Sequence, residues 1–320
     1  MAVTADPLDP PTPHKSRLRA VWFFILLALA NLMWAGQGPA VKFLDKLLGP
    51  IALTFLPFYV ATILLIPLLI RERSKLPNPA WPVRKDWKMF AAAGIFGQIA
   101  AQLGATWGIL LSTASNFSIL NLLIPVITAV LATFMLRERM NAVRILCLVI
   151  GLVGVMVLSA GDLRQARFIE MKYLAGNLLI LVGCLGSAYY NVYCKGLLSR
   201  FQEIEILIYS YIVASLASIP LLIWVEPFRF SAFAAFDRNA WLSFAFLAVF
   251  MYGLSMVLFF YVLKHLDVTI ASLSLYLVPV FGVILAVTML GEKMTLQSVV
   301  GAAVVLSGTL IVMKYDKLPD

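Results

Sequence analysis

Neutral polar and aromatic side chains recur at helical spacing inside strongly apolar segments of this sequence. Asn31, Trp34 and Gly38 are three and four residues apart, so a helix carries them on one face. Gln98 and Gln102, four residues apart, share a face in the same way. Such groups can hydrogen-bond a polar organic solute and stack against its apolar part. The predicted substrate-binding residues are Asn31, Trp34, Gln98, Gln102, Asn121, Ser187, Tyr190, Asn191, Tyr252, Ser255, Ser272 and Tyr276.

The alternative interpretation of these residues is structural. In a membrane bundle, Asn, Gln, Ser and Thr side chains also hydrogen-bond one helix to another. Any single residue of the set fits that role, whereas polar faces on six segments together favour a cavity. Trp22, Trp87, Trp224 and Trp241 stand near segment ends, a position typical of tryptophan at the membrane interface.

Titratable groups are missing from the middles of the apolar segments. None of the 16 acidic residues lies there, and the two histidines are His14, near the N-terminus, and His265, at a segment end. Proton-coupled and cation-coupled transporters commonly bury a carboxylate or a histidine at membrane depth. The sequence also has no HExxH, GxSxG or Gly-rich phosphate loop and no paired carboxylates. We therefore expect neither an enzyme nor a bound metal or cofactor.

Composition places the chain in a lipid bilayer. Hydrophobic residues make up 62% of the 320 residues and charged residues only 13%, and the mean hydropathy is +0.94. A soluble domain is about half apolar. The net charge of +9 does not indicate a nucleic-acid partner, because the basic residues stand in short segments between apolar runs. Cys147, Cys184 and Cys194 lie inside apolar runs, so no disulfide framework is indicated.

Apolar runs long enough to cross the ~30 Å hydrocarbon core of a bilayer divide the chain into ten predicted spans. The spans are residues 21–42, 51–70, 88–110, 115–136, 141–160, 173–195, 204–225, 240–263, 269–290 and 295–313. We predict an all-α integral membrane protein of two five-helix repeats, residues 21–160 and 173–313. Residues 1–20 carry several prolines and no apolar periodicity, which predicts a disordered cytoplasmic tail.

The division into two halves rests on a repeated stretch of sequence. Residues 115–140 and 269–294, which are 154 positions apart, are identical at ten positions. Each copy is an apolar helix with a proline about a third of the way along and a glutamate at its end. Because each half has five spans, the two copies cross the membrane in opposite directions, and we predict an inverted repeat.

Three of the prolines in the predicted spans are candidate hinges: Pro39, Pro125 and Pro279. A proline supplies no backbone N–H and frees a carbonyl group, which can kink a helix and leave polar groups facing a cavity. Ordinary tolerance of proline in membrane helices is the alternative explanation. Because Pro125 and Pro279 are equivalent in the repeat, we predict that these prolines are hinges.

Glu138 and Glu292 end the two copies of the repeat beside basic residues. We predict that each is a structural cap, which either caps the N-terminus of the next span or pairs with a loop cation. Arg137 in the first copy stands where the second copy has Gly291. A role for the two glutamates in gating is the alternative.

Loop charge determines the predicted orientation. With both termini in the cytoplasm, most of the 25 lysine and arginine residues fall in cytoplasmic segments, in agreement with the positive-inside rule. We therefore predict a multi-pass protein of the cell inner membrane with both termini cytoplasmic. Gly151, Gly154, Gly301 and Gly308 predict close helix packing, within a monomer or across a homodimer face.

The chain resembles the EamA family of the drug/metabolite transporter superfamily. The resemblance is clearest over residues 266–312, where Asp267, Pro279, the Gly291–Glu292 pair and a Gly-rich last span stand in the family's order. It extends more loosely over both halves. The resemblance implies ten helices in two inverted halves, cytoplasmic termini, a central substrate cavity and alternating access.

These observations predict a permease, and more specifically an exporter of a small organic metabolite such as an amino acid or a derivative. Its partners are a small-molecule substrate and the lipid bilayer. Because no acid lies at mid-membrane, we expect uniport or exchange and no proton coupling through a buried carboxylate. Two alternatives remain open: a polyspecific exporter of drugs or aromatic compounds, and a non-transporting membrane assembly subunit packed without a solvent-filled cavity.

Overall fold

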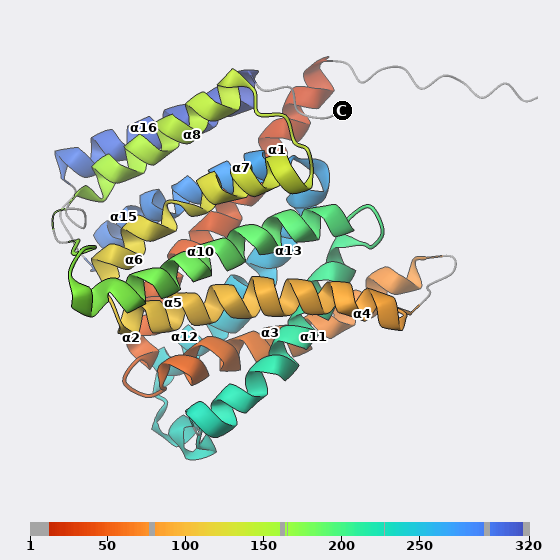
Figure 1. Cartoon of the computed structure of the whole chain (residues 1–320), viewed down its shortest axis with the longest axis vertical. Helices are drawn as coiled ribbons and strands as arrows, with labels where there is room; N and C mark the ends of the chain where they lie inside the picture. Colours follow the sequence, from red (N-terminus) through yellow and green to blue (C-terminus); the bar gives the residue numbers. More distant parts are fainter. Residues whose placement is uncertain are drawn as a thin grey trace, which may run out of the picture.

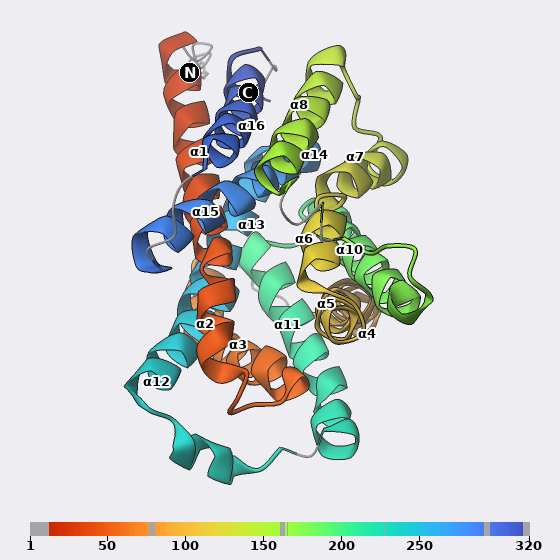
Figure 2. The same cartoon turned by 90° about the vertical axis from the view of Figure 1, so that its left-hand side faces the viewer.

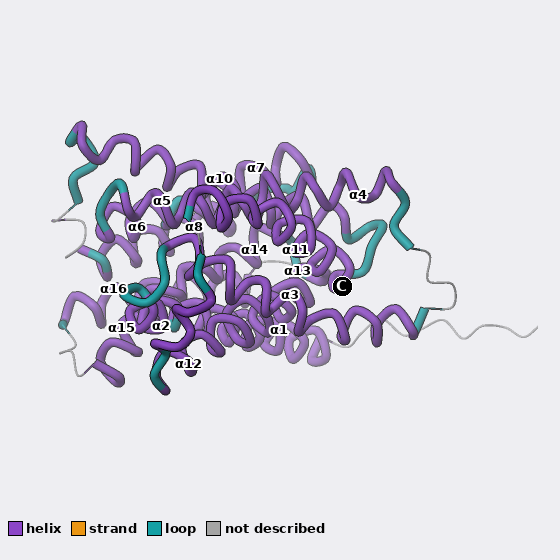
Figure 3. The backbone as a smooth tube through the Cα atoms, turned by 90° about the horizontal axis from the view of Figure 1, so that it is seen from below, coloured by secondary structure: helices purple, strands orange, loops and turns teal. Residues whose placement is uncertain are grey.

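The computed structural model describes residues 13–76, 81–160, 164, 166–226, 228–290 and 295–315. Every regular element in these residues is a helix, and Figure 3 shows them as a purple bundle without strands. Nine helices among the described residues are long and apolar enough to cross a membrane. A further apolar helix, Ala142–Leu158, has 17 residues. The fold is therefore an all-helical membrane fold.

The elements follow one another along the chain without a separate soluble domain among the described residues (Figure 1). In the first half they are α1 (Pro13–Ala35), α2 (Gln37–Leu44), α3 (Pro50–Ser74), α4 (Arg84–Ala91), η1 (Ala92–Ile99), α5 (Ala100–Leu110), α6 (Ala114–Asn121), α7 (Ile124–Met135) and α8 (Ala142–Leu158). In the second half they are α10 (Met171–Leu197), α11 (Glu203–Pro220), η2 (Leu221–Val225), η3 (Phe230–Ala235), α12 (Arg238–Ala245), η4 (Phe246–Leu254), α13 (Ser255–His265), α14 (Val268–Leu273), η5 (Ser274–Tyr276), α15 (Leu277–Leu290) and α16 (Leu296–Tyr315).

The first helix begins earlier than the sequence predicts. α1 starts at Pro13, so the predicted disordered tail over residues 1–20 is wrong for its last eight residues. Proline is well accepted at the first position of a helix, because the N–H that it lacks has no helical partner there. No proline or glycine follows before residue 36, so nothing stops the helix from extending through the basic segment. Residues 1–12 lie outside the described part.

Two stretches of π-helix occupy equivalent places in the two halves. η1 continues α4, and η4 continues α12. α12 begins 154 positions after α4 and η4 begins 154 positions after η1, the same offset as in the repeated sequence. π-helical stretches inside membrane helices often mark functional positions. Gln98 lies in η1 and Tyr252 in η4, and both are predicted substrate-binding residues.

The bundle has a packed interior and an apolar exterior. Phe58, Phe259 and Tyr211 are among the largest fully buried side chains of the core. On the outside, Phe134 is 79% exposed and Ile63 65% exposed. Apolar side chains of this size on the outer face of long helices fit contact with lipid tails, because exposing an apolar side chain to hydrocarbon costs no free energy.

Small residues allow the closest helix contacts. A Cβ atom placed on Gly104 of α5 would lie 2.5 Å from the backbone nitrogen of Gly183 in α10, and one on Gly154 of α8 would lie 2.8 Å from the backbone nitrogen of Val305 in α16. Figure 1 shows α8 lying along α16 and α5 along α10. Contacts of this kind agree with small-residue packing between membrane helices.

We predict that Gly104→Ala lowers the thermal unfolding temperature of the detergent-solubilised protein, because the added methyl group meets the backbone of α10. Overpacking of this kind costs about 1–3 kcal/mol. Gly282→Ala is the matched control, since a Cβ atom there has nothing within 4 Å. An unchanged unfolding temperature for Gly104→Ala would contradict the close contact of α5 with α10.

Candidate functional site

Helix breaks lie just ahead of the three predicted hinge prolines. Pro39 supplies no N–H to the carbonyl of Ala35, where α1 ends, and Pro125 supplies none to the carbonyl of Asn121, where α6 ends. Ahead of Pro279 the α-helix ends at Leu273 and gives way to the 3-10 turn η5.

Asn31 of α1 meets the break at η5. It is fully buried, and its Nδ2 donates to the carbonyl of Leu27 (2.7 Å) and to Ser274 Oγ (3.0 Å). The Ser274 hydroxyl donates in turn to the carbonyl of Ala271 (2.7 Å), which fixes the orientation of the Asn31 amide. Asn31 Oδ1 finds no hydrogen-bond donor among the described residues. It is a buried acceptor, a kind of group that is normally hydrogen-bonded in a folded protein.

Tyr276 closes the same turn. Its side chain is 2% exposed, and its hydroxyl has no hydrogen-bond partner in the part of the chain that the structure describes. Its ring lies against Gly151 of α8, where a Cβ atom would come within 2.3 Å of Cδ2. A small cavity of about 10 Å³ lies beside Tyr276 and Ser274. That volume is at the limit for one water molecule, so the site is closed to an organic solute in this conformation.

A second group of predicted residues is hydrogen-bonded within the bundle. Tyr190 of α10 lies 2.9 Å from Ser210 Oγ of α11, and because Ser210 already donates to the carbonyl of Leu207, the tyrosine hydroxyl is the donor. Tyr252 of η4 donates to Gln102 Oε1 of α5 at 3.3 Å. These bonds join helices to one another, which is the structural role that the sequence left as an alternative.

The remaining predicted residues make local or weaker contacts. Ser255 donates to the carbonyl of Met251, and Ser272 to that of Thr269 at 2.8 Å, each within its own helix. The Trp34 ring packs against Phe259 with centroids 5.4 Å apart. Asn121 Oδ1 accepts a weak bond from Cys184 Sγ at 3.4 Å, and Ser187, Gln98 and Asn191 are wholly or partly buried in η1 and α10.

A further buried polar atom belongs to Thr128 of α7. Its Oγ1 lacks a partner among the described residues, although the side chain is fully buried. Threonine hydroxyls inside helices usually bond a carbonyl of the preceding turn. Thr128 lies near the start of α7, the helix that begins beside Pro125, so its hydroxyl lies close to the helix break between α6 and α7. Sequence patterns do not separate it from an ordinary helical threonine.

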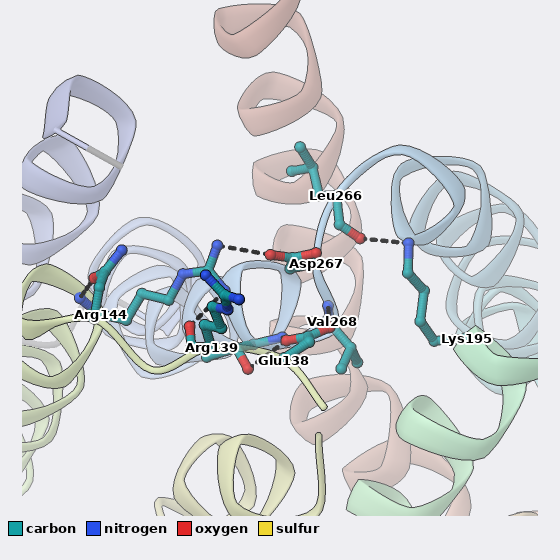
Figure 4. Close-up of polar contacts among 9 residues, drawn as sticks. Glu138, Arg139, Arg144, Lys195, Leu266, Asp267 and Val268 are labelled. Atoms are coloured by element: carbon teal, nitrogen blue, oxygen red, sulfur yellow. Dashed lines mark hydrogen bonds and ion pairs between the residues drawn. The ribbon is translucent and has the colours of Figure 1, made fainter. Parts of the chain in front are cut away.

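Glu138 is a cap, but of a different helix from the one predicted. Its carboxylate accepts the backbone N–H groups of Val268 (2.8 Å) and Thr269 (3.2 Å) at the start of α14 (Figure 4). The next helix, α8, is capped instead by Asn141, whose Oδ1 accepts the N–H of Arg144 at 2.8 Å. Glu138 stands three residues ahead of that cap position. Because Asn141 already caps α8, the Glu138 carboxylate can bind the start of α14 in the second half of the chain. Glu292 lies outside the described residues.

A second carboxylate caps a helix across the two halves at the opposite end of the bundle. Glu226, after η2, accepts the N–H groups of Ile51 and Ala52 at the start of α3, both at 3.0 Å. It borders an open hollow of about 360 Å³ that Phe228 and Arg229 also line. The only sequence signal for Glu226 is that it is an acidic residue directly after an apolar run.

Comparisons with known proteins find relatives over nearly the whole chain. A model of the EamA-like transporter family matches residues 21–160 and 174–314. The chain is 27% identical to an uncharacterized transporter of Archaeoglobus fulgidus, over 91% of this chain and 98% of the relative. It is 26% identical to a probable terminal-alkyne amino-acid exporter of Streptantibioticus cattleyicolor, over 92% and 93%. It is 22% identical to an S-adenosylmethionine uptake transporter of Rickettsia prowazekii, over 92% of each.

The fold matches a solved crystal structure. That protein is 17% identical in sequence and superposes with a TM-score of 0.76 over 91% of this chain and 98% of its own. At this level of identity the match establishes the arrangement of the helices and leaves the substrate to other observations.

We predict opposite effects on stability for the two kinds of tyrosine. Tyr190→Phe removes a buried hydrogen bond and costs about 1 kcal/mol of unfolding free energy. Tyr276→Phe removes a hydroxyl with no partner among the described residues, so it leaves the unfolding temperature unchanged or raises it. Thermal unfolding of the purified variants in one detergent makes the comparison. A larger loss for Tyr276→Phe than for Tyr190→Phe would show that the Tyr276 hydroxyl is bonded in the folded protein.

Proposed function

Because the chain belongs to the EamA-like transporter family, we propose that this multi-pass membrane protein exports a small organic metabolite by alternating access. The proposed substrates are amino acids or their derivatives. One relative is named a probable terminal-alkyne amino-acid exporter, and another carries S-adenosylmethionine by uptake. The observation that carries the proposal is a pair of buried polar groups at the η5 break, Asn31 Oδ1 and the Tyr276 hydroxyl, for which the described residues offer no hydrogen-bond partner.

The chemistry of these two groups suits an amino acid. With its amide orientation fixed, Asn31 Oδ1 can only accept, and an ammonium or amide N–H supplies the donor it lacks. The Tyr276 hydroxyl can donate to a carboxylate. Both groups are closed off from solvent here, so in this proposal a rearrangement at the helix breaks opens the site. Pro39, Pro125 and Pro279 are the proposed hinges.

Two inverted five-helix halves account for the symmetry of the contacts. Thr62 of α3 and Ser215 of α11 are 153 positions apart, close to the repeat offset, and their hydroxyls lie 3.3 Å from each other. Two residues that are one position from equivalence by the repeat and touch each other would lie close to a two-fold axis relating the proposed halves. The equivalent π-helical stretches η1 and η4 support the same symmetry. Such an axis in the membrane plane is typical of inverted-repeat transporters.

The halves are not in the same conformation, as alternating access requires. At the end of the bundle that holds Glu138, α14 packs against α7. By the repeat, the corresponding pair at the other end is α6 and α15, which lie apart in Figure 2. On that side, Cβ atoms placed on Gly38 and Gly282 would meet nothing within 4 Å. The proposed pathway is therefore open toward Gly38 and closed beside Glu138.

The proposed orientation puts the Glu138 end in the cytoplasm of a cell with the protein in its inner membrane. Figure 1 shows the start of α1 and the end of α16 on the same, right-hand side of the bundle. The loops that the positive-inside rule assigns to one side also meet in space: Glu138, Asp267 and Lys195 lie together, and Glu226 contacts the start of α3 at the other end.

A non-transporting membrane subunit is the second candidate, and one observation favours it. Tyr190, Tyr252 and Gln102 are tied into the bundle by hydrogen bonds, and the cavity beside Tyr276 is too small for a solute. A protein of that kind would bind no metabolite. A ligand screen therefore separates the two candidates.

We predict that an amino acid or a derivative raises the thermal unfolding temperature of the purified protein, because a ligand that binds only the folded state stabilises it. At a free concentration of about 100 times Kd the stabilisation is about 2.7 kcal/mol. We expect the same ligand to be transported across the membrane of proteoliposomes that contain the protein. Asn31→Leu and Tyr276→Phe abolish both responses, whereas Tyr190→Phe, tested as the control, keeps them. A metabolite library without any stabilising ligand favours the non-transporting subunit.

We further predict that a pH gradient alone does not drive accumulation of that substrate in proteoliposomes, because no acid lies at mid-membrane to carry a proton. Preloading the vesicles with unlabelled substrate should instead stimulate uptake by exchange. Uphill accumulation under a pH gradient, abolished by an uncoupler, would overturn this prediction.

A further inference from the structure

The start of α14 is held by side chains from other parts of the chain (Figure 4). Glu138 accepts the N–H groups of Val268 and Thr269 and also the Thr269 hydroxyl, the last at 2.7 Å. Arg144 of α8 pairs with Asp267 at 2.6 Å. Lys195, near the end of α10, donates to the carbonyls of Leu263 (2.7 Å) and Leu266 (2.8 Å), which belong to the end of α13. We call Glu138, Arg144 and Lys195 the α14 clamp.

The helix cap at this point comes from a distant residue. Asp267 occupies the N-cap position of α14, where an aspartate side chain normally accepts a backbone N–H, yet it makes no capping bond. Its carboxylate pairs with Arg144 instead. Glu138, 130 positions earlier in the chain, supplies the missing cap. The start of α14 is thus satisfied only while α7 and α14 stay together.

The equivalent helix start in the first half is satisfied locally. Thr113 corresponds to Asp267 by the repeat offset of 154 and is the N-cap of α6. Its hydroxyl accepts the N–H of Asn116 at 3.0 Å. In this conformation, one of the two repeated helices is therefore capped by its own residue and the other by a residue of the opposite half.

The backbone that carries Glu138 is strained. Arg137 has φ = 58°, in the left-handed region that residues with a side chain rarely adopt, and it is the one described residue other than glycine with positive φ. The second copy of the repeat has Gly291 at this position. The left-handed turn lets the N–H of Glu138 return to the carbonyl of Ala132 at 3.2 Å. Strain of this kind persists where surrounding contacts hold it, and the contact here is the cap on α14.

We propose that Glu138 is a positioning residue for transport. By capping α14 from the opposite half, it keeps the bundle closed at its own end while the Gly38 end is open, and it must release α14 before a solute can leave beside it. This inference rests on the proposed transport function. Its direct consequence, a shift between the two conformations, can be measured without any substrate.

The test reads the accessibility of introduced cysteines in detergent. Cys147, Cys184 and Cys194 are first replaced by alanine, so that the maleimide reacts only with the introduced cysteine. All three are buried and none forms a disulfide, so the replacement breaks no covalent link. Gly38→Cys then reports the open end, and Ala271→Cys, at a fully buried position of α14, reports the clamped end. Both are labelled with a water-soluble maleimide in the presence and absence of Glu138→Gln, which keeps the side-chain length but removes the charge and one acceptor.

We expect Glu138→Gln to raise the labelling rate of Ala271→Cys and to lower that of Gly38→Cys, each by about fivefold, the factor that loss of one helix cap implies. Glu72→Gln is the control, because Glu72 is partly exposed and pairs only locally, with Lys75 among the described residues. Unchanged rates at both reporters in a folded Glu138→Gln protein would overturn the proposal. Faster labelling at both would mean general loosening, and would overturn it as well.

A second variant guards against simple loss of folding. Val268→Pro removes one N–H that Glu138 accepts, and proline is well tolerated at the first position of a helix. Asp267 already has φ = −59° and ψ = 144°, the conformation that a residue before proline prefers. This variant should shift both labelling rates in the same direction as Glu138→Gln. If both variants shift the rates and no metabolite is transported, the clamp stands and the proposed function fails. If transport is measured and neither variant shifts the rates, the clamp fails alone.

Discussion

The structure depends on one constraint: in hydrocarbon, every backbone N–H and carbonyl must find a partner inside the protein. A continuous helix meets this constraint by itself except at its ends. In this chain several ends are met by charged side chains from elsewhere. Glu138 satisfies the start of α14, Glu226 the start of α3, and Lys195 the end of α13. Anionic groups stand at helix starts and a cationic group at a helix end, as the helix dipole favours.

Features encoded by neighbouring residues could be predicted from the sequence. Apolar runs locate most of the helices, and the repeated stretch predicts breaks at equivalent places because proline acts on the carbonyl four residues before it. α6 accordingly ends at Asn121, and η5 precedes Pro279. The composition of residues 1–20 does not predict the start of α1 at Pro13, because a bias toward proline resembles disorder, while a single proline at the first helical position does not prevent a helix.

Features that depend on contacts between distant residues could not be predicted. Tyr190 and Tyr276 look alike in sequence, each a tyrosine in an apolar helix, yet one donates to Ser210 and the other has no described partner. Which of them is structural depends on where α11 lies, and no local pattern contains that position. For the same reason the local pattern predicts that Glu138 either caps the following helix or pairs with a loop cation, whereas the fold brings a helix from 130 positions away within its reach.

In the proposed transport cycle, the contacts of the α14 clamp offset the free-energy cost of two buried polar groups that have no partner among the described residues. Asn31 Oδ1 and the Tyr276 hydroxyl have no hydrogen-bond partner among the described residues. In the proposed cycle, a closed state that leaves a buried acceptor without a donor would cost about 1–3 kcal/mol. Such a state persists only if other contacts stabilise it, and the clamp on α14 is directly connected to η5 through the six residues of α14. A solute that satisfies both groups would remove that cost without touching the clamp. In the proposed cycle, binding at η5 and closure by the clamp are therefore separate interactions at the two ends of α14, so a movement of α14 would change both at once.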